Sequence, residues 1–307
     1  MKKWLFSITM FFVILLSVSC QNTTDISDIQ ETKIDKSVSD VILSKSTISK
    51  LDAFNDSLLR NYASPLGVNR GKLEKGIKIA FADCYGLYTG AKWGFRLGGF
   101  LGPNAAVIGA SILGPVVGAY QSYQAADPDC VPLSYEECVG AYVTYMEEKA
   151  DVSDFRLKKV NLNFTTNTER FDRVSSNGIV HNILLDNMIN KNISSTPIQK
   201  ALPKTHSDIL LHPDAETTFR KITSKRNVYL IPELQDSETD EIISLFNTAV
   251  INGASSYKDL EYISNRYILE VANSKDLTEN QQDNVISAVF TMASSAEYWK
   301  VFDQNTK

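Results

Sequence analysis

Apolar residues recur every three or four positions along most of the chain, which is the period of one face of an α-helix. No long stretch alternates apolar with polar residues, and no strand–helix–strand rhythm is present. The pattern therefore predicts a mainly α fold with at most one short β element, at 156–164. The predicted helices cover residues 46–62, 72–101, 105–125, 134–149, 175–191, 214–225, 237–250, 256–273 and 278–302.

Capping residues mark several of the predicted helix starts. Ser134 with Glu137, and Thr278 with Gln281, have the spacing of a capping box, in which each residue satisfies the other's backbone N–H. The last three helices are joined by short turns, so we expect an antiparallel C-terminal bundle. We divide the predicted fold into a helical domain at 47–150 and a mainly helical C-terminal region at 151–307.

A stripe of small residues crosses the two helices of 72–126, at intervals of four. Glycine costs about 1 kcal/mol against alanine in a helix interior, so repeated glycine needs a compensating contact. Because the turn at 102–104 interrupts the stripe, we expect a helical hairpin whose two backbones meet closely along it, a glycine zipper. The stripe comprises Gly86, Gly90, Gly94, Gly98, Gly102, Ala106, Ala110, Gly114 and Gly118.

Three interpretations of this hairpin remain open from the sequence. The hairpin could be the packed centre of a soluble helical domain, it could insert into or perturb a membrane, or its stripe could join copies of the chain. No residue from 97 to 126 is charged, so the second arm is expected to be buried in protein or in lipid. Its continuous apolar core of roughly sixteen residues is shorter than the ~20 that span a bilayer. Burial of 97–126 inside the chain's own fold would favour the first interpretation.

The first twenty residues resemble a bacterial lipoprotein signal peptide. Lys2 and Lys3 precede a short apolar run that ends at Cys20, the predicted lipidation site. Ser17 stands where that signal usually has leucine, and the small residues before Cys20 also fit ordinary signal-peptide cleavage, which would equally export the chain. Residues 21–46 are polar and read as a flexible tether. We expect a cell-envelope location, at the outer membrane, with the membrane as a partner through the lipid anchor.

The composition narrows the remaining classes. The net charge is −5, so no basic excess points to nucleic acid. Outside the cytoplasm cysteines can oxidise, and Cys130 with Cys138 flank a turn, which makes them the favoured disulfide pair and leaves Cys84 as a buried free thiol.

Candidate chemical sites are few. Two histidines and two aspartates within nine residues, His206, Asp208, His212 and Asp214, could ligate a metal, but their spacing matches no metal motif and the segment has loop composition, so no metal is predicted. His181 and the following Asn182 are expected to form a hydrogen-bonded pair in the core rather than a catalytic pair with a cysteine. No nucleophile, phosphate-loop or dinucleotide motif occurs, so neither a catalytic residue nor a cofactor is predicted.

The lipoprotein-like leader, the glycine stripe, "GIVHNILL" and the terminal "SSAEYW" together resemble exported glycine-zipper lipoproteins of Bacteroidota, a group of uncharacterised proteins. The resemblance implies an envelope location and no assigned activity. The sequence thus predicts an exported, lipid-anchored, non-enzymatic envelope or surface protein that associates with itself or with an envelope protein. The alternative is a membrane-active effector, pore-forming or bacteriocin-like, that uses the hairpin.

Overall fold

The computed structural model describes residues 46–62, 70–148, 168–224 and 236–305. These residues belong to one compact unit, 45–307. They form α-helices without a strand, which confirms the mainly α prediction for this part of the chain. The leader at 1–20 with Cys20, the tether at 21–45 and the predicted strand at 156–164 lie outside the described residues.

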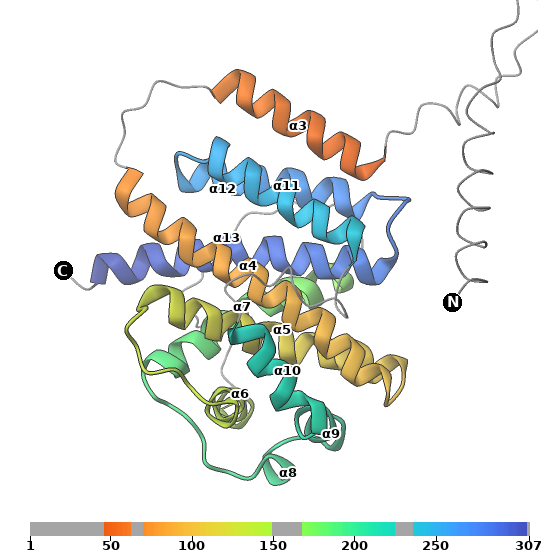
Figure 1. Cartoon of the computed structure of the whole chain (residues 1–307), viewed down its shortest axis with the longest axis vertical. Helices are drawn as coiled ribbons and strands as arrows, with labels where there is room; N and C mark the ends of the chain where they lie inside the picture. The colour runs from red at the N-terminus through yellow and green to blue at the C-terminus, as the bar shows by residue number, and fades with distance from the viewer. Residues whose placement is uncertain (1–45, 63–69, 149–167, 225–235, 306–307) are drawn as a thin grey trace, which may run out of the picture. The chain divides into compact units, whose positions relative to one another are not determined.

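Eleven helices are described, and Figure 1 labels each of them. In chain order they are α3 (Thr47–Tyr62), α4 (Arg70–Gly99), α5 (Pro103–Ala126), α6 (Tyr135–Glu148), α7 (Thr168–Ile189), α8 (Ile198–Ala201), α9 (Lys204–Leu210), α10 (Pro213–Ser224), α11 (Ser237–Gly253), α12 (Tyr257–Ala272) and α13 (Glu279–Asn305).

The predicted capping residues act at the helix starts as expected. The Ser134 N–H donates to Glu137 Oε2 at 2.7 Å, and the Glu137 N–H donates to Ser134 Oγ at 3.1 Å. Thr278 and Gln281 make the same reciprocal pair at the start of α13. These bonds satisfy backbone groups that a helix start leaves without a partner, which is why the sequence located the starts to within one residue.

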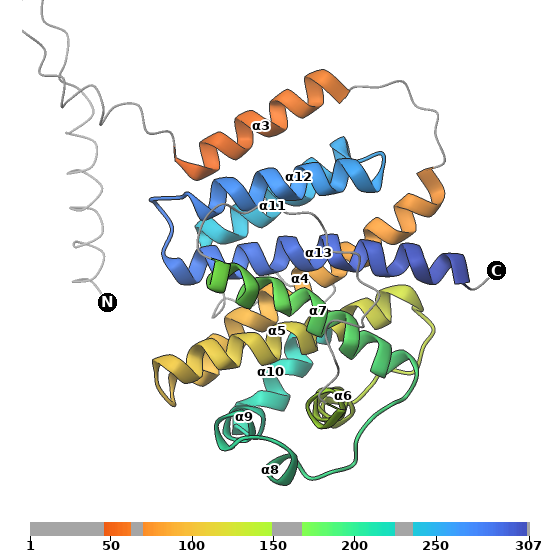
Figure 2. The ribbon, with the colours of Figure 1, turned by 180° about the vertical axis from the view of Figure 1, so that it is seen from behind.

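Two hydrophobic cores share α4 and α13. Helices α3, α11 and α12 pack with α13 and the first half of α4 around Leu51, Phe246 and Tyr267. The second half of α4 packs with α5, α6, α7, α9 and α10 around Ile112, Leu184 and other apolar residues. Figures 1 and 2 show α13 running between these two groups of helices. The predicted C-terminal bundle of α11, α12 and α13 is present, and α3 from the N-terminal side completes it.

One predicted loop is helical. The segment with His206 and His212 was expected to be a loop, but α9 covers Lys204–Leu210 and the short α8 precedes it. Pro197 and Pro203 sit at the N-caps of these helices, each with φ −55°. Proline is tolerated at a helix start because its fixed φ suits the helix and no hydrogen bond is lost there. The prolines thus begin these short helices.

Candidate functional site

The hairpin of α4 and α5 is built on backbone-to-backbone contact. A Cβ added at Gly86 would lie 2.8 Å from the Cα of Gly118, and one at Gly98 would lie 2.7 Å from the Cα of Ala106. At Gly94 an added Cβ would lie 2.9 Å from the amide nitrogen of Ala110, and closer still to the carbonyl of the residue before it. Real Cβ atoms do not approach other heavy atoms below 3.0 Å. These glycines therefore leave the room that brings the two backbones together.

The register near the turn differs by one residue from the predicted stripe. Gly98 faces the Ala105 carbonyl and Gly94 faces Gly109, a glycine that the four-residue pattern omitted. A spacing of four advances ~400° around a helix, so the stripe drifts by ~40° per step and neighbouring residues take over the contact. A Cβ added at Gly102 would meet no atom within 4 Å, so the glycine is required there by its φ of 119°, a conformation that other residues rarely adopt.

The outer surface of the hairpin is covered by the rest of the unit. α5 packs on α7, and α4 packs on α13. By length and composition α5 is the helix among the described residues that could cross a membrane, yet 72% of its most apolar window is buried inside the fold. In this structure the stripe meets its own chain, which favours the first of the three interpretations.

A polar cluster lies where α4, α7 and α13 meet beside the hairpin. The side chains of Asp83 and His181 are fully buried, and His181 Nε2 lies 3.4 Å from Asp83 Oδ1. The other carboxylate oxygen of Asp83 accepts a hydrogen bond from the Ser295 hydroxyl. Asn182 Nδ2 donates to the Ser294 carbonyl at 3.3 Å, so its Oδ1 accepts from His181 Nδ1 at 2.9 Å. The predicted His181–Asn182 core pair is therefore confirmed.

The two ring nitrogens of His181 have different surroundings. His181 Nδ1 faces the Asn182 acceptor and carries a hydrogen, while Nε2 faces Asp83 Oδ1 at 3.4 Å without forming a hydrogen bond. Because Nε2 and Oδ1 are both buried, the close approach of the two side chains is their main compensation for the loss of water.

The cluster lacks the arrangement of a nucleophilic site. Ser295 bonds to the aspartate rather than to the histidine, so the serine–histidine contact of a catalytic triad is not formed, and all three side chains are fully buried. Cys84, next to Asp83 in the chain, is also fully buried, and burial, reinforced by the Asp83 charge, raises the pKa of its thiol. An elevated thiol pKa suppresses the reactive thiolate. The cluster is suited to joining three helices.

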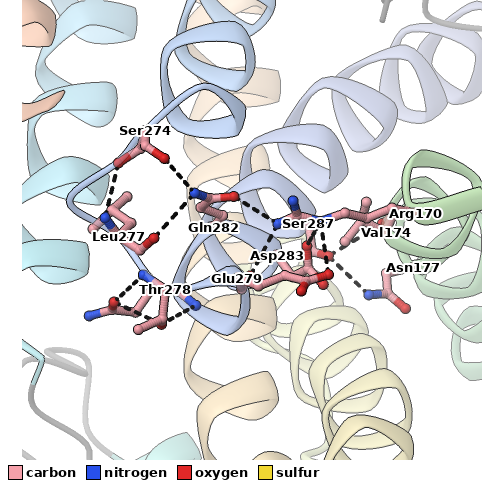
Figure 3. A network of polar contacts seen from close by, with 11 residues as sticks. Arg170, Val174, Asn177, Ser274, Leu277, Thr278, Glu279, Gln282, Asp283 and Ser287 are labelled. Atoms are coloured by element: carbon pink, nitrogen blue, oxygen red, sulfur yellow. Dashed lines mark hydrogen bonds and ion pairs between the residues drawn. The ribbon is translucent and has the colours of Figure 1, made fainter. Parts of the chain in front are cut away.

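Two further networks join distant helices. Lys92 Nζ on α4 lies 3.2 Å from Asp240 Oδ1 on α11, and the Tyr88 hydroxyl donates to the same oxygen at 2.7 Å. Figure 3 shows a second network, in which Arg170 Nε on α7 donates to Asp283 Oδ1 on α13 at 2.6 Å and Arg170 Nη2 donates to Gln282 Oε1 at 2.9 Å. The side chain of Lys92 is only 12% exposed, so this lysine is a largely buried partner of an acidic residue.

The four candidate metal ligands at 206–214 do not converge on one point, although His212 Nδ1 lies 3.8 Å from Asp214 Oδ2. His206 Nδ1 lies 3.2 Å from the Tyr142 hydroxyl, and burial lowers the pKa of His206. His212 Nδ1 accepts from the Asp214 N–H at 3.2 Å, and its ring stacks on Phe100 at 5.7 Å between centroids. Within the described ranges, no three His, Cys, Asp or Glu side chains are grouped to hold a metal ion. Asp208 lies on the exposed side of α9.

The predicted disulfide is absent from the structure. Cys84, Cys130 and Cys138 are all free thiols. Cys138 is fully buried in the core on α6, where burial raises the pKa of its thiol, whereas Cys130 lies in the turn after α5 with its Sγ 4.0 Å from the Tyr123 carbonyl. The two residues are close in sequence, but one side chain points into the core and the other is held at the turn.

The turn of the hairpin exposes apolar side chains. Phe100 is 68% exposed, Leu101 47% and Val107 38%. Pro103 and Asn104 between them are exposed as well. We call these five residues the hairpin tip; they carry no charge. The sequence indicated this feature through its charge-free run, but only the packing of α4 and α5 separates the exposed tip from the buried stripe.

No protein-family model, curated protein or solved structure matches this chain. The resemblance to Bacteroidota lipoproteins therefore stays a prediction from the sequence.

Proposed function

We propose that this chain is an exported, lipid-anchored envelope protein that works by associating with a partner and not by catalysis. The observation that carries the proposal is the location of the chemically versatile side chains. Asp83, His181, Cys84 and Cys138 are sealed in the helical core, where no substrate meets them. Large apolar side chains at the hairpin tip are exposed instead, as is usual for interaction surfaces.

The packing of α4 against α5 limits which surface can bind a partner. Gly86, Gly94 and Gly98 are occupied by the second arm of the same hairpin and are not offered to another molecule. Association with a partner or with a second copy must therefore use the outer surface of the helical unit. The stripe serves this function indirectly, because it holds the hairpin rigid and fixes the position of its tip.

Mass spectrometry of the mature chain tests the anchor. We expect a new N-terminus at Cys20 that carries acyl groups, and we expect the protein to fractionate with membranes. A Cys20→Ala variant, expressed at the same level, should lose the acyl groups and leave the membrane fraction. An unmodified Cys20, or a wild type that fractionates like the variant, would contradict the proposal.

A membrane-active effector is the second candidate, favoured by the length and apolar composition of α5. For α5 to insert, it would have to leave its contacts with α4 and α7, so this function requires a large rearrangement. Leakage of a dye from anionic vesicles distinguishes the two candidates. The proposed function predicts no leakage above that of a Gly94→Leu control, in which the hairpin cannot close; leakage by the wild type alone would favour the effector.

A further inference from the structure

We infer that the hairpin tip docks shallowly on the bilayer that holds the lipid anchor, so that the helical unit lies against the membrane in a fixed orientation. The inference rests on the proposed function, because the anchor supplies the proximity. The tip supplies the contact, through Phe100, Leu101 and Val107. The partner of the tip is thus the phospholipid surface.

The first argument is the composition of the tip and its surroundings. No charged residue occurs from 97 to 126, so the tip can enter the headgroup region without burying a charge. The aromatic ring of Phe100 stacks on His212 at 5.7 Å with an interplanar angle of 11°, which holds the ring at the surface. Asp214, 3.8 Å from His212 and 71% exposed at its side chain, limits the insertion to the interfacial region.

The second argument is where the tether joins the unit. Only 25 residues, 21–45, separate the predicted anchor from the helical unit, and a chain of that length spans at most about 90 Å, which keeps the unit near the bilayer. The described chain begins at Ser46, before α3, and the Thr47 N–H donates to Asp276 Oδ2 at 2.9 Å in the loop between α12 and α13. In Figures 1 and 2 the start of α3, this loop and the turn of the hairpin lie along one side of the helical unit, the right side in Figure 1 and the left side in Figure 2.

The exposed apolar area of the tip favours a membrane over a second copy of the chain as its partner. Three partly exposed apolar side chains present on the order of 300 Å², whereas a stable protein interface buries about 800 Å² per partner. A patch of this size cannot hold a dimer by itself. It suffices for a membrane contact when an acyl anchor already provides most of the attachment, because two weak signals combine at high effective concentration.

The experiment uses tryptophan as a reporter in the anchored chain that begins at Cys20, which no longer contains Trp4 of the leader. Phe100→Trp places the reporter at the tip, and Ile251→Trp is the matched control, since Ile251 is 67% exposed near the C-terminal end of α11. The native Trp93 and Trp299 are buried and equal in both variants. Each anchored protein is reconstituted in vesicles of phosphatidylethanolamine and phosphatidylglycerol, with or without bromine near the carbonyl end of the acyl chains.

We expect bromine to reduce the Phe100→Trp signal about twofold relative to Ile251→Trp, because interfacial side chains reach the upper acyl region. Equal quenching in the two variants, with Cys20 acylated and the protein bound to the vesicles, would overturn the tip contact while leaving the anchor intact. A concentration-dependent change in the tip reporter without quenching would assign the tip to a second copy and also overturn it. A chain without acyl groups would refute the proposed function, and the tip inference with it.

Leu101→Trp provides a second reporter if the first variant loses its helical circular dichroism. Because Leu101 is 47% exposed in the same turn, the same preferential quenching is expected. If bromine quenches neither the Phe100→Trp nor the Leu101→Trp reporter more than the Ile251→Trp control, the inference is overturned.

Discussion

The close packing of the hairpin can be tested by adding one methyl group. In Gly94→Ala the new Cβ would lie 2.9 Å from the Ala110 amide nitrogen and closer still to the Gly109 carbonyl, both of them backbone atoms that no rotamer change can move away. The substitution gains up to ~1 kcal/mol of helix propensity. Forcing the two backbones apart costs more, because overpacking typically costs ~1–3 kcal/mol and the contacts of the neighbouring layers of the hairpin loosen with it.

We therefore expect Gly94→Ala to lower the free energy of unfolding by about 2 kcal/mol, because a clash with backbone lies at the upper end of the overpacking range, ~3 kcal/mol, and up to ~1 kcal/mol of propensity offsets it. For a unit of this size that corresponds to a fall in Tm of roughly 4–8 °C. Urea unfolding of residues 21–307, followed by circular dichroism, measures the change. A larger side chain in Gly94→Leu should have a still greater effect.

Gly76 supplies the matched control on the same helix. A Cβ there would meet only the Tyr257 hydroxyl, at an ordinary 3.4 Å, so Gly76→Ala should be neutral or stabilise by up to ~1 kcal/mol. Opposite signs for the two variants would isolate the interhelical contact from helix propensity. If Gly94→Ala were as stable as Gly76→Ala, the backbone contact would not exist and the packing account would be refuted.

Three other predictions concern polar groups and thiols. Asp83→Ala should destabilise the fold by about 3–5 kcal/mol in urea unfolding, because it leaves His181 buried without its partner; a loss below ~1 kcal/mol would mean that the pair is open to water. Burial disfavours ionised Asp276, but hydrogen bonds from Ser274 and Thr47 outweigh this effect and lower the pKa of Asp276 from 3.8 to about 2. The contribution of Asp276 to stability is therefore present above pH 3.8 and is lost as the pH falls toward 2. Asp276→Asn should remove this part of the acid dependence, and an unchanged profile of stability against pH would refute the prediction. In the folded protein a thiol reagent should label Cys130 well before Cys138, whose burial raises its pKa, and equal labelling rates would contradict the assignment.

Local signals explain how much of the fold could be predicted. The helix starts at Ser134, Ser256 and Thr278 were predictable because each capping residue acts within three positions of itself. The hairpin was predictable because the repeat and the break both lie within one stretch of sequence. The helices α8 and α9 were missed because they are shorter than the window in which a helical period can be recognised.

Features that depend on long-range contacts could not be predicted from the sequence. Asp83 stands in an apolar stretch, which signals a buried polar group, but nothing in the sequence names His181 or Ser295 as its partners. The disulfide prediction used only sequence proximity, whereas pairing depends on the directions of the two side chains. Gly109 was missed because the repeat was extended rigidly, although the contact line drifts around each helix.

The central claim is that the small-residue stripe is consumed inside the fold of a single chain, which leaves only the hairpin tip to meet the membrane. Hydrogen exchange of the α5 amides, followed by mass spectrometry at two protein concentrations about a hundredfold apart, with and without vesicles, tests it most directly. The account predicts equally slow exchange across residues 109–126 of α5, beyond the hairpin tip, under all four conditions. Slow exchange that appears only at high concentration or only with lipid would show that the stripe meets a second copy or a membrane, and would contradict the account.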